Sequence, residues 1–226
     1  MFRIYVSVVS LAVAIFLIVL ATPLLMANIE LLKVQSLKER VLAKQTLSQS
    51  EWLDLRSGHV ASLQWRENYQ THLEKAKIEL EISRRFPEEV EDNWRLEAEK
   101  SFEESLRNSP SNPVAWSYLA YLRKKNMVGA FHGSEEALRM ALETGPHELS
   151  IAPLQLRLAI DFWDKLTPQD QTRVNNIVVW LERSRPGLLV DLATEKSSYF
   201  KFIVHALKHD DEALLRFIEG ASQARF

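Results

Sequence analysis

The chain opens with a long stretch that contains no charged side chain. Residues 4–29 read IYVSVVSLAVAIFLIVLATPLLMANI. A helix needs about 20 predominantly apolar residues to cross a bilayer, and this stretch exceeds that length. We therefore predict that residues 1–28 form a single-pass membrane anchor. The residues predicted to span the membrane include Tyr5, Val9, Val13, Phe16, Val19 and Leu24.

A cleaved signal peptide is the alternative interpretation of the same segment. Its cleavage would need small residues before the cut site. The best candidates end at Ala21 and Ala27, but Pro23 follows the first closely and Leu25 is bulky for the second. The length of the apolar run favours an uncleaved anchor.

Residues 29–93 are predicted to form a helical region beside the membrane. Val34, Leu37 and Val41 recur at helical spacing with charges between them, which indicates an amphipathic helix. A self-association stalk that makes a homo-oligomer is the alternative, although the heptad pattern is not sustained. Trp52 and Trp65 lie in a less regular part of the region, so we predict that they are exposed or touch the membrane interface.

Residues 94–226 show short apolar stripes at helical spacing separated by Pro, Gly and polar breaks. Thr167 precedes Pro168 and Asp170, the pattern of a capped helix start. Gly145 is placed to end a helix in the left-handed conformation. The predicted helices cover 94–109, 113–125, 134–144, 151–165, 168–185, 197–208 and 211–222.

A degenerate repeat lies within this helical domain. Four positions recur after 36 residues, and a Trp, a Leu and a small residue occupy the helix between them. Small residues at facing positions let antiparallel helices approach, and large ones fill the gap to the next pair. The pattern resembles the tetratricopeptide (TPR) repeat. The positions are Ala98, Phe102, Ser105 and Pro110, then Trp116, Leu119 and Ala120, then Ser134, Leu138, Ala141 and Pro146. The fold class predicted is all-α, an anchor helix followed by a TPR-like array of helical hairpins.

Composition narrows the classes of function. The formal charge is −2, with 28 basic and 30 acidic residues, so the basic surface expected of a nucleic-acid-binding protein is not indicated. Cysteine is absent, which excludes disulfide frameworks, thiolate metal sites and cysteine nucleophiles. Only six Gly residues occur in 226, which favours helices over barrels or Gly-rich nucleotide loops.

No motif predicts catalysis, a metal or a cofactor. His147-Glu148 begins like a zinc-protease helix, but Ile151 stands where a second His is required. His205 and His209 could share a helix face, yet no spacing sets a third ligand. The paired carboxylates, such as Glu88-Glu89, Glu103-Glu104 and Glu135-Glu136, lie in charged stretches typical of a solvated surface.

The stretch 108–186 resembles a family of small bacterial proteins linked to exopolysaccharide biosynthesis, which carry an N-terminal membrane segment and a degenerate TPR domain. The phrases that carry the resemblance are Ser109-Pro110, Asn112-Pro113, Ala115-Trp116, Leu119-Ala120, Thr144-Gly145-Pro146, Arg157-Leu158, Trp163 and Leu166-Thr167-Pro168.

The resemblance implies a non-catalytic accessory role and no catalytic residues. We therefore expect a tethered scaffold that binds protein partners in the making or export of an envelope polysaccharide. A glycan-binding or glycan-active module and a TPR assembly factor for another envelope complex are the alternatives. The expected location is the bacterial inner membrane. The count of Lys and Arg after the apolar segment would keep the soluble part in the cytoplasm. The very short N-terminal tail, with Arg3 alone, instead favours the periplasm.

Overall fold

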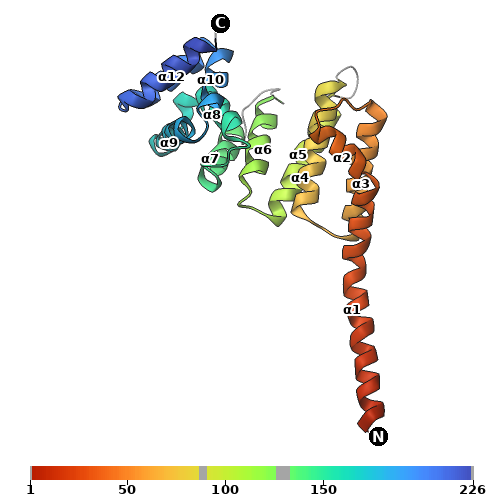
Figure 1. Ribbon diagram of the computed structural model, residues 1–226. Coiled ribbons are helices and arrows are strands. Elements are labelled where there is room, and N and C mark those ends of the chain that lie inside the picture. Colours follow the sequence, from red (N-terminus) through yellow and green to blue (C-terminus); the bar gives the residue numbers. More distant parts are fainter. Residues whose placement is uncertain (1, 87–90, 126–132, 225–226) are drawn as a thin grey trace. The chain divides into compact units, whose positions relative to one another are not determined.

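The computed structural model describes residues 2–86, 91–125 and 133–224, and every regular element in those ranges is a helix (Figure 1). Side-chain environments are described from Ser10 onward and, in the fifth helix, from Asn93. The chain divides into two compact units, residues 1–108 and residues 109–226. The prediction of an all-α protein is confirmed for the described residues.

Helix α1 (Phe2–Lys33) begins unit 1 and extends beyond its other helices (Figure 1). Its portion from Ser10 to Lys33 is long and apolar enough to cross a membrane. Tyr5 and Val9 lie within this helix. Large apolar side chains along it are exposed, including Val13, Phe16, Val19 and Leu24. From Ser10 onward, Ala27 is the first side chain that is buried. The apolar segment therefore continues as one helix into the packed part of unit 1.

Four further helices complete unit 1: α2 (Gln35–Leu42), α3 (Gln49–Trp65), α4 (Tyr69–Arg85) and α5 (Glu91–Asn108). Helix α3 packs on α1 and α4, and α4 packs on α5. Ser48 and Glu51 form a capping box that starts α3, because each side chain bonds the other's backbone N–H. The core joins α1, α3 and α4 through Val34, Leu47, Trp52, Leu55, Ile78 and Ile82.

The two tryptophans predicted to be exposed differ in the structure. Trp52 retains only 3% of its surface and belongs to the core of unit 1, so the prediction is wrong for this residue. The reason is helical periodicity, since Trp52, Leu55 and His59 lie on one face of α3 and all three are buried. Trp65, at the end of α3, is 44% exposed.

A fully buried carboxylate connects three helices of unit 1. Glu79 on α4 has no exposed surface, and its Oε1 accepts a hydrogen bond of 2.6 Å from Arg56 Nε on α3. Its Oε2 accepts one of 2.6 Å from the Ser101 hydroxyl on α5. Lys75 Nζ lies 3.3 Å from Glu79 and donates to Ser101 Oγ at 2.8 Å. A buried charge needs such pairing to be tolerated, so this network fixes how α3, α4 and α5 fit together.

The contact between α1 and α3 depends on a glycine. A Cβ built on Gly58 of α3 would lie 2.7 Å from both methyl carbons of Val34, which follows α1. Both residues are buried. Only a residue without a side chain allows the Val34 methyl groups to sit against the α3 backbone, so Gly58 sets the register of the two helices.

Unit 2 contains α6 (Pro113–Lys125), α7 (Ser134–Thr144), α8 (Ala152–Asp161), a 3-10 turn η1 (Trp163–Lys165), α9 (Pro168–Ser184), α10 (Pro186–Glu195), α11 (Ser197–Leu207) and α12 (Asp211–Gln223). As predicted, Thr167 caps α9 by accepting a hydrogen bond of 3.2 Å from the Asp170 amide. Helix α10 was not predicted and packs against α9, α11 and α12. In addition, Arg216 of α12 bonds the buried Glu182 of α9 at 2.8 and 3.0 Å.

The residues of the repeat pattern lie in two helical hairpins, one in each unit. In unit 1, α4 pairs with α5, and in unit 2, α6 pairs with α7. The predicted boundary between residues 93 and 94 falls inside the first turn of α5, whereas the chain divides into its two compact units after α5, between Asn108 and Ser109. The fully or almost fully buried pattern residues are Ala98, Phe102, Ser105, Leu119, Ala120, Ser134, Leu138 and Ala141.

The remaining pattern positions lie nearer the surface. Pro110 is exposed, Trp116 and Pro146 are half-buried, and the Trp116 indole donates to the Pro110 carbonyl at 2.7 Å. Gly145 is not left-handed as predicted, because its φ is −156°. Its lack of a side chain instead makes room for Pro113, whose ring carbons would lie 2.4 Å from an added Cβ.

We expect Gly58→Ala to destabilise unit 1 by about 1–3 kcal/mol, because the new methyl group collides with the stiff Val34 side chain. Thermal unfolding of the full chain in detergent measures the loss. Gly187→Ala is the matched control, since an added Cβ there meets nothing within 4 Å, and it should be neutral or stabilising by up to about 1 kcal/mol. Equal effects of the two substitutions would contradict the packing argument.

Candidate functional site

The His and Glu residues that the sequence analysis considered for catalysis or metal binding do not form a common site among the described residues. His147 stacks near Trp180, with ring centroids 5.0 Å apart. Among the described residues, no group of three His, Asp or Glu side chains could hold a metal ion. Glu135 pairs with Lys165 at 2.8 Å, and Glu104 pairs with Arg107 at 2.8 Å. Glu88 and Glu89 lie outside the described residues.

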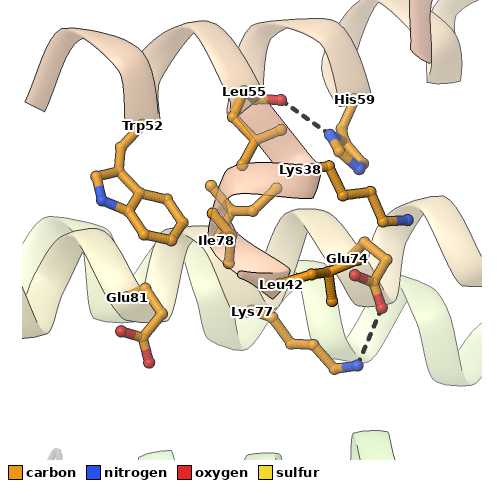
Figure 2. A pocket seen from close by; sticks show the side chains of 10 residues that line it. Lys38, Leu42, Trp52, Leu55, His59, Glu74, Lys77, Ile78 and Glu81 are labelled. Atoms are coloured by element: carbon orange, nitrogen blue, oxygen red, sulfur yellow. Dashed lines mark hydrogen bonds and ion pairs between the residues drawn. The ribbon is translucent and has the colours of Figure 1, made fainter. Parts of the chain in front are cut away.

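A hollow in unit 1 is lined by side chains of α2, α3 and α4 (Figure 2). It has a volume of about 150 Å³. Apolar side chains from three helices form most of its lining, and charged side chains from α2 and α4 stand around them. We call it the α2 pocket. Its lining residues are Lys38, Val41, Leu42, Trp52, Leu55, His59, Glu74, Lys77, Ile78 and Glu81.

His59 is the buried polar group of this pocket. Its Nδ1 lies 2.8 Å from the Leu55 carbonyl oxygen, one helical turn back (Figure 2). Because a carbonyl oxygen can only accept, Nδ1 carries the proton and Nε2 holds a lone pair. Burial lowers the pKa of His59, so the neutral ring is favoured. The pocket therefore combines an apolar lining with one imidazole acceptor.

The charges around the α2 pocket are mostly paired. Lys77 bonds Glu74 at 3.0 Å, and Glu81 bonds Arg84 at 3.0 Å and Arg85 at 3.3 Å. Lys38 of α2 forms no ion pair with the part of the chain that the structure describes. A group that enters this pocket would meet an apolar surface and, at the edge, the Lys38 ammonium group, which is not paired within the described residues.

Helix α2 is held over the pocket by an ion pair at its far side. Arg40 of α2 bonds the Glu51 carboxylate in the first turn of α3, and Arg40 Nη2 also donates to the Thr46 carbonyl at 3.2 Å. The Arg40 guanidinium, together with hydrogen bonds from Ser48, lowers the pKa of Glu51 to about 2. The half-buried Leu37 and Val41 of α2 also pack against the core of unit 1, so α2 is held by this ion pair together with apolar contacts.

Unit 2 contains a larger hollow among α9, α10 and α12, with a volume of about 640 Å³. Its lining includes Glu182 and Arg216, which are bonded to each other, and the apolar Val190 and Phe217. Arg183 and Asp191 also line this hollow, but both are exposed, and its one buried polar side chain, Glu182, is already neutralised by Arg216. The α2 pocket is therefore the stronger candidate.

The chemistry available in the α2 pocket is binding. A cavity of roughly 150 Å³ accepts one benzene-sized group. The pocket is therefore large enough for one apolar or aromatic group, with Lys38 at its edge. The two carboxylates that line it, Glu74 and Glu81, are engaged in ion pairs with Lys77 and with Arg84 and Arg85.

No protein-family model, no curated protein and no solved structure matches this chain. Interpretation of the site consequently depends on the geometry of the described residues.

The sequence predicted none of the α2 pocket. The signal that was present is the Ser48-x-x-Glu51 capping box followed by Trp52, Leu55 and His59 at helical spacing. It locates α3 and its buried face. The predicted stripe of Val34, Leu37 and Val41 does pack against the core of unit 1, and Val41 lines the pocket. The sequence does not, however, show which helix this stripe covers, and it gives no sign of the tertiary Arg40–Glu51 pair.

We expect acid to release α2. Glu51 has a pKa below its usual 4.5 in the folded protein, so its stabilising effect is complete above about pH 4.5 and is lost as the pH falls toward about 2. Hydrogen exchange of the α2 amides, corrected for the intrinsic rates, should accelerate through this window. In Glu51→Gln, α2 should exchange faster at neutral pH and the window should disappear.

Glu136→Gln is the control for this experiment. The Arg139 guanidinium also lowers the pKa of the Glu136 carboxyl, but both residues lie on α7 in unit 2. Exchange of α2 should therefore remain as in the unsubstituted protein. A pH response of α2 that survives Glu51→Gln would contradict the role assigned to the ion pair.

Proposed function

We propose that this protein is a membrane-tethered, non-catalytic scaffold that binds protein partners, with α1 as an uncleaved anchor and the α2 pocket as a docking point. The observation that carries the proposal is the continuity of α1. Bare apolar side chains cover it from Leu11 to Leu25, and the same helix then packs into unit 1 from Ala27. A span fused in this way would hold the pocket close to the membrane.

The helical hairpins support binding of a partner rather than catalysis. Buried small residues bring the paired helices together, and serine hydroxyls link them across the hairpin. Ser105 Oγ donates to the Tyr69 carbonyl at 2.9 Å, and Ser134 Oγ donates to the Ala120 carbonyl at 2.8 Å. Arrays of TPR-like hairpins use such packing to present extended binding surfaces, and we propose that this chain belongs to that architecture.

The resemblance of residues 108–186 to exopolysaccharide-associated proteins suggests the setting. We propose that the partners belong to the machinery that makes or exports an envelope polysaccharide, in a bacterial inner membrane with the soluble part in the periplasm. A glycan-binding role remains the second candidate. Burial of Trp52 leaves Trp65 as the exposed member of the two aromatics first considered for it.

We expect a photo-crosslinking amino acid at Leu42 to capture a specific membrane-machinery protein in living cells. Leu42 lines the α2 pocket and is 73% exposed, so the substitution should not disturb folding. The same probe at Leu53, which is 39% exposed on α3 and does not line the pocket, is the matched control. Mass spectrometry of the adducts identifies the partner. The probe at Leu53 should not crosslink this partner.

Ile78→Phe tests whether the pocket itself is used. Ile78 lines the pocket and belongs to the core of unit 1, so the larger ring would reduce the empty volume at a cost of up to about 3 kcal/mol in stability. Crosslinking from Leu42 should be lost at a temperature at which circular dichroism shows the variant to be folded. Capture of glycan alone, or capture unaffected by Ile78→Phe, would contradict docking of a protein at this pocket. A reporter fused after Phe226 that is active only in the cytoplasm would contradict the periplasmic placement.

A further inference from the structure

The end of unit 1 where α3 stops and α4 starts points toward the apolar segment of α1. Helix α3 runs antiparallel to α1, and the connection from α3 to α4 lies on the side of unit 1 from which α1 extends (Figure 1). Gly58 contacts Val34, which fixes the register of the two helices. Because the two helices are antiparallel, seven residues back from Val34 and seven residues forward from Gly58 reach the same level. Ala27 and Trp65 therefore lie level with each other.

The height of Ala27 places Trp65 near the membrane surface. The uncharged run begins at Ile4, so Ala27 lies about 35 Å along the helix at roughly 1.5 Å per residue. The hydrocarbon core of a bilayer is about 30 Å thick, and the headgroup layers bring the total to about 40–45 Å. Ala27 and Trp65 would therefore lie a few ångströms outside the hydrocarbon, within the headgroup layer.

Aromatic and basic side chains at this end of unit 1 suit that layer, and the one exposed carboxylate of the α3–α4 connection, Glu67, bonds His72 Nε2 at 2.6 Å. Trp65 is 44% exposed, and the neighbouring Arg66 is also exposed. Tyr69 begins α4, and Ser105 bonds its carbonyl, which brings the end of α5 with exposed Arg107 to the same place. Trp and Tyr are enriched where membrane meets water, and Arg reaches the phosphates with its long side chain.

We propose that the α3–α4 end of unit 1 rests in the headgroup layer of the bilayer that α1 crosses, with Trp65 and Arg66 as its principal contacts. The proposal rests on the membrane anchoring in the proposed function and goes beyond it. Because this seating fixes unit 1 against the lipid, the opening of the α2 pocket would be held at a set distance from the membrane surface.

The absence of cysteine from the sequence makes the test direct, because single cysteines can carry a nitroxide. The full chain is reconstituted in vesicles of phosphatidylethanolamine and phosphatidylglycerol, with labels at Gln64→Cys, Gln70→Cys, Ile18→Cys and Gln45→Cys. Collision of each label with oxygen and with a water-soluble nickel complex measures its depth. Gln64 and Gln70 are exposed beside Trp65, Ile18 is exposed on α1, and Gln45 lies exposed beyond α2.

The labels at positions 64 and 70 should give an oxygen-to-nickel ratio several-fold above that at 45 and below that at 18. Trp65→Ala should lower the ratio at 64 and 70 toward the value at 45, and Trp65→Phe should lower it less. Water-like values at 64 and 70 with a deep label at 18 would overturn the seating and leave the anchor intact. A water-exposed label at 18 would overturn the anchor itself. If neither oxygen nor the nickel complex reaches the labels at 64 and 70, a protein covers this end of unit 1, and the proposed contact with lipid is wrong.

Discussion

The fit of Val34 against Gly58 is the constraint from which the rest of unit 1 follows. Both methyl carbons of Val34 would lie 2.7 Å from any Cβ at position 58, so the α3 backbone itself forms the packing surface for the end of α1. This contact joins the apolar helix to the packed domain without a flexible linker. It also sets the level of α3 along α1, and therefore the level of the pocket and of Trp65.

A second constraint acts on the opposite side of α3. The buried carboxylate of Glu79 must have partners, and Arg56, Lys75 and Ser101 supply them from α3, α4 and α5. Removing one partner of a buried charge typically costs about 3–5 kcal/mol, so these helices are locked to one arrangement. Arg56 also lies over the Trp94 ring at 5.0 Å, which ties the start of α5 to the same network.

The sequence predicts local features of this protein well and tertiary ones poorly. The apolar segment and the capped start at Thr167 depend on composition and on neighbours a few residues away, and both occur in the structure. Trp52 shares a helical face with Leu55 and His59, but that this face is covered by other helices, α4 among them, becomes visible only in the tertiary structure. Glu79 gives no local signal either, since a buried carboxylate in an acidic stretch looks like a solvated one until its partners are known.

The short helix α10 shows a different limit. Pro186 ends the preceding helix by its sequence, yet it also occupies the first position of α10, where proline is equally suited. Pro186 therefore marks both the end of α9 and the start of α10, and the sequence does not distinguish the two roles. The candidate site shares this dependence on assembly, because the Arg40–Glu51 pair that places α2 over the pocket connects residues whose meeting no spacing predicts.

The account as a whole requires that the apolar helix stays attached to unit 1 in the mature protein. The most direct measurement is the intact mass of the protein extracted from the membranes of the cells that make it, with its N-terminal peptide identified. We predict a mature chain that retains residues 4–29 and resists extraction by alkaline carbonate. A mature chain that begins after Ala21 or Ala27 would contradict the tethered scaffold.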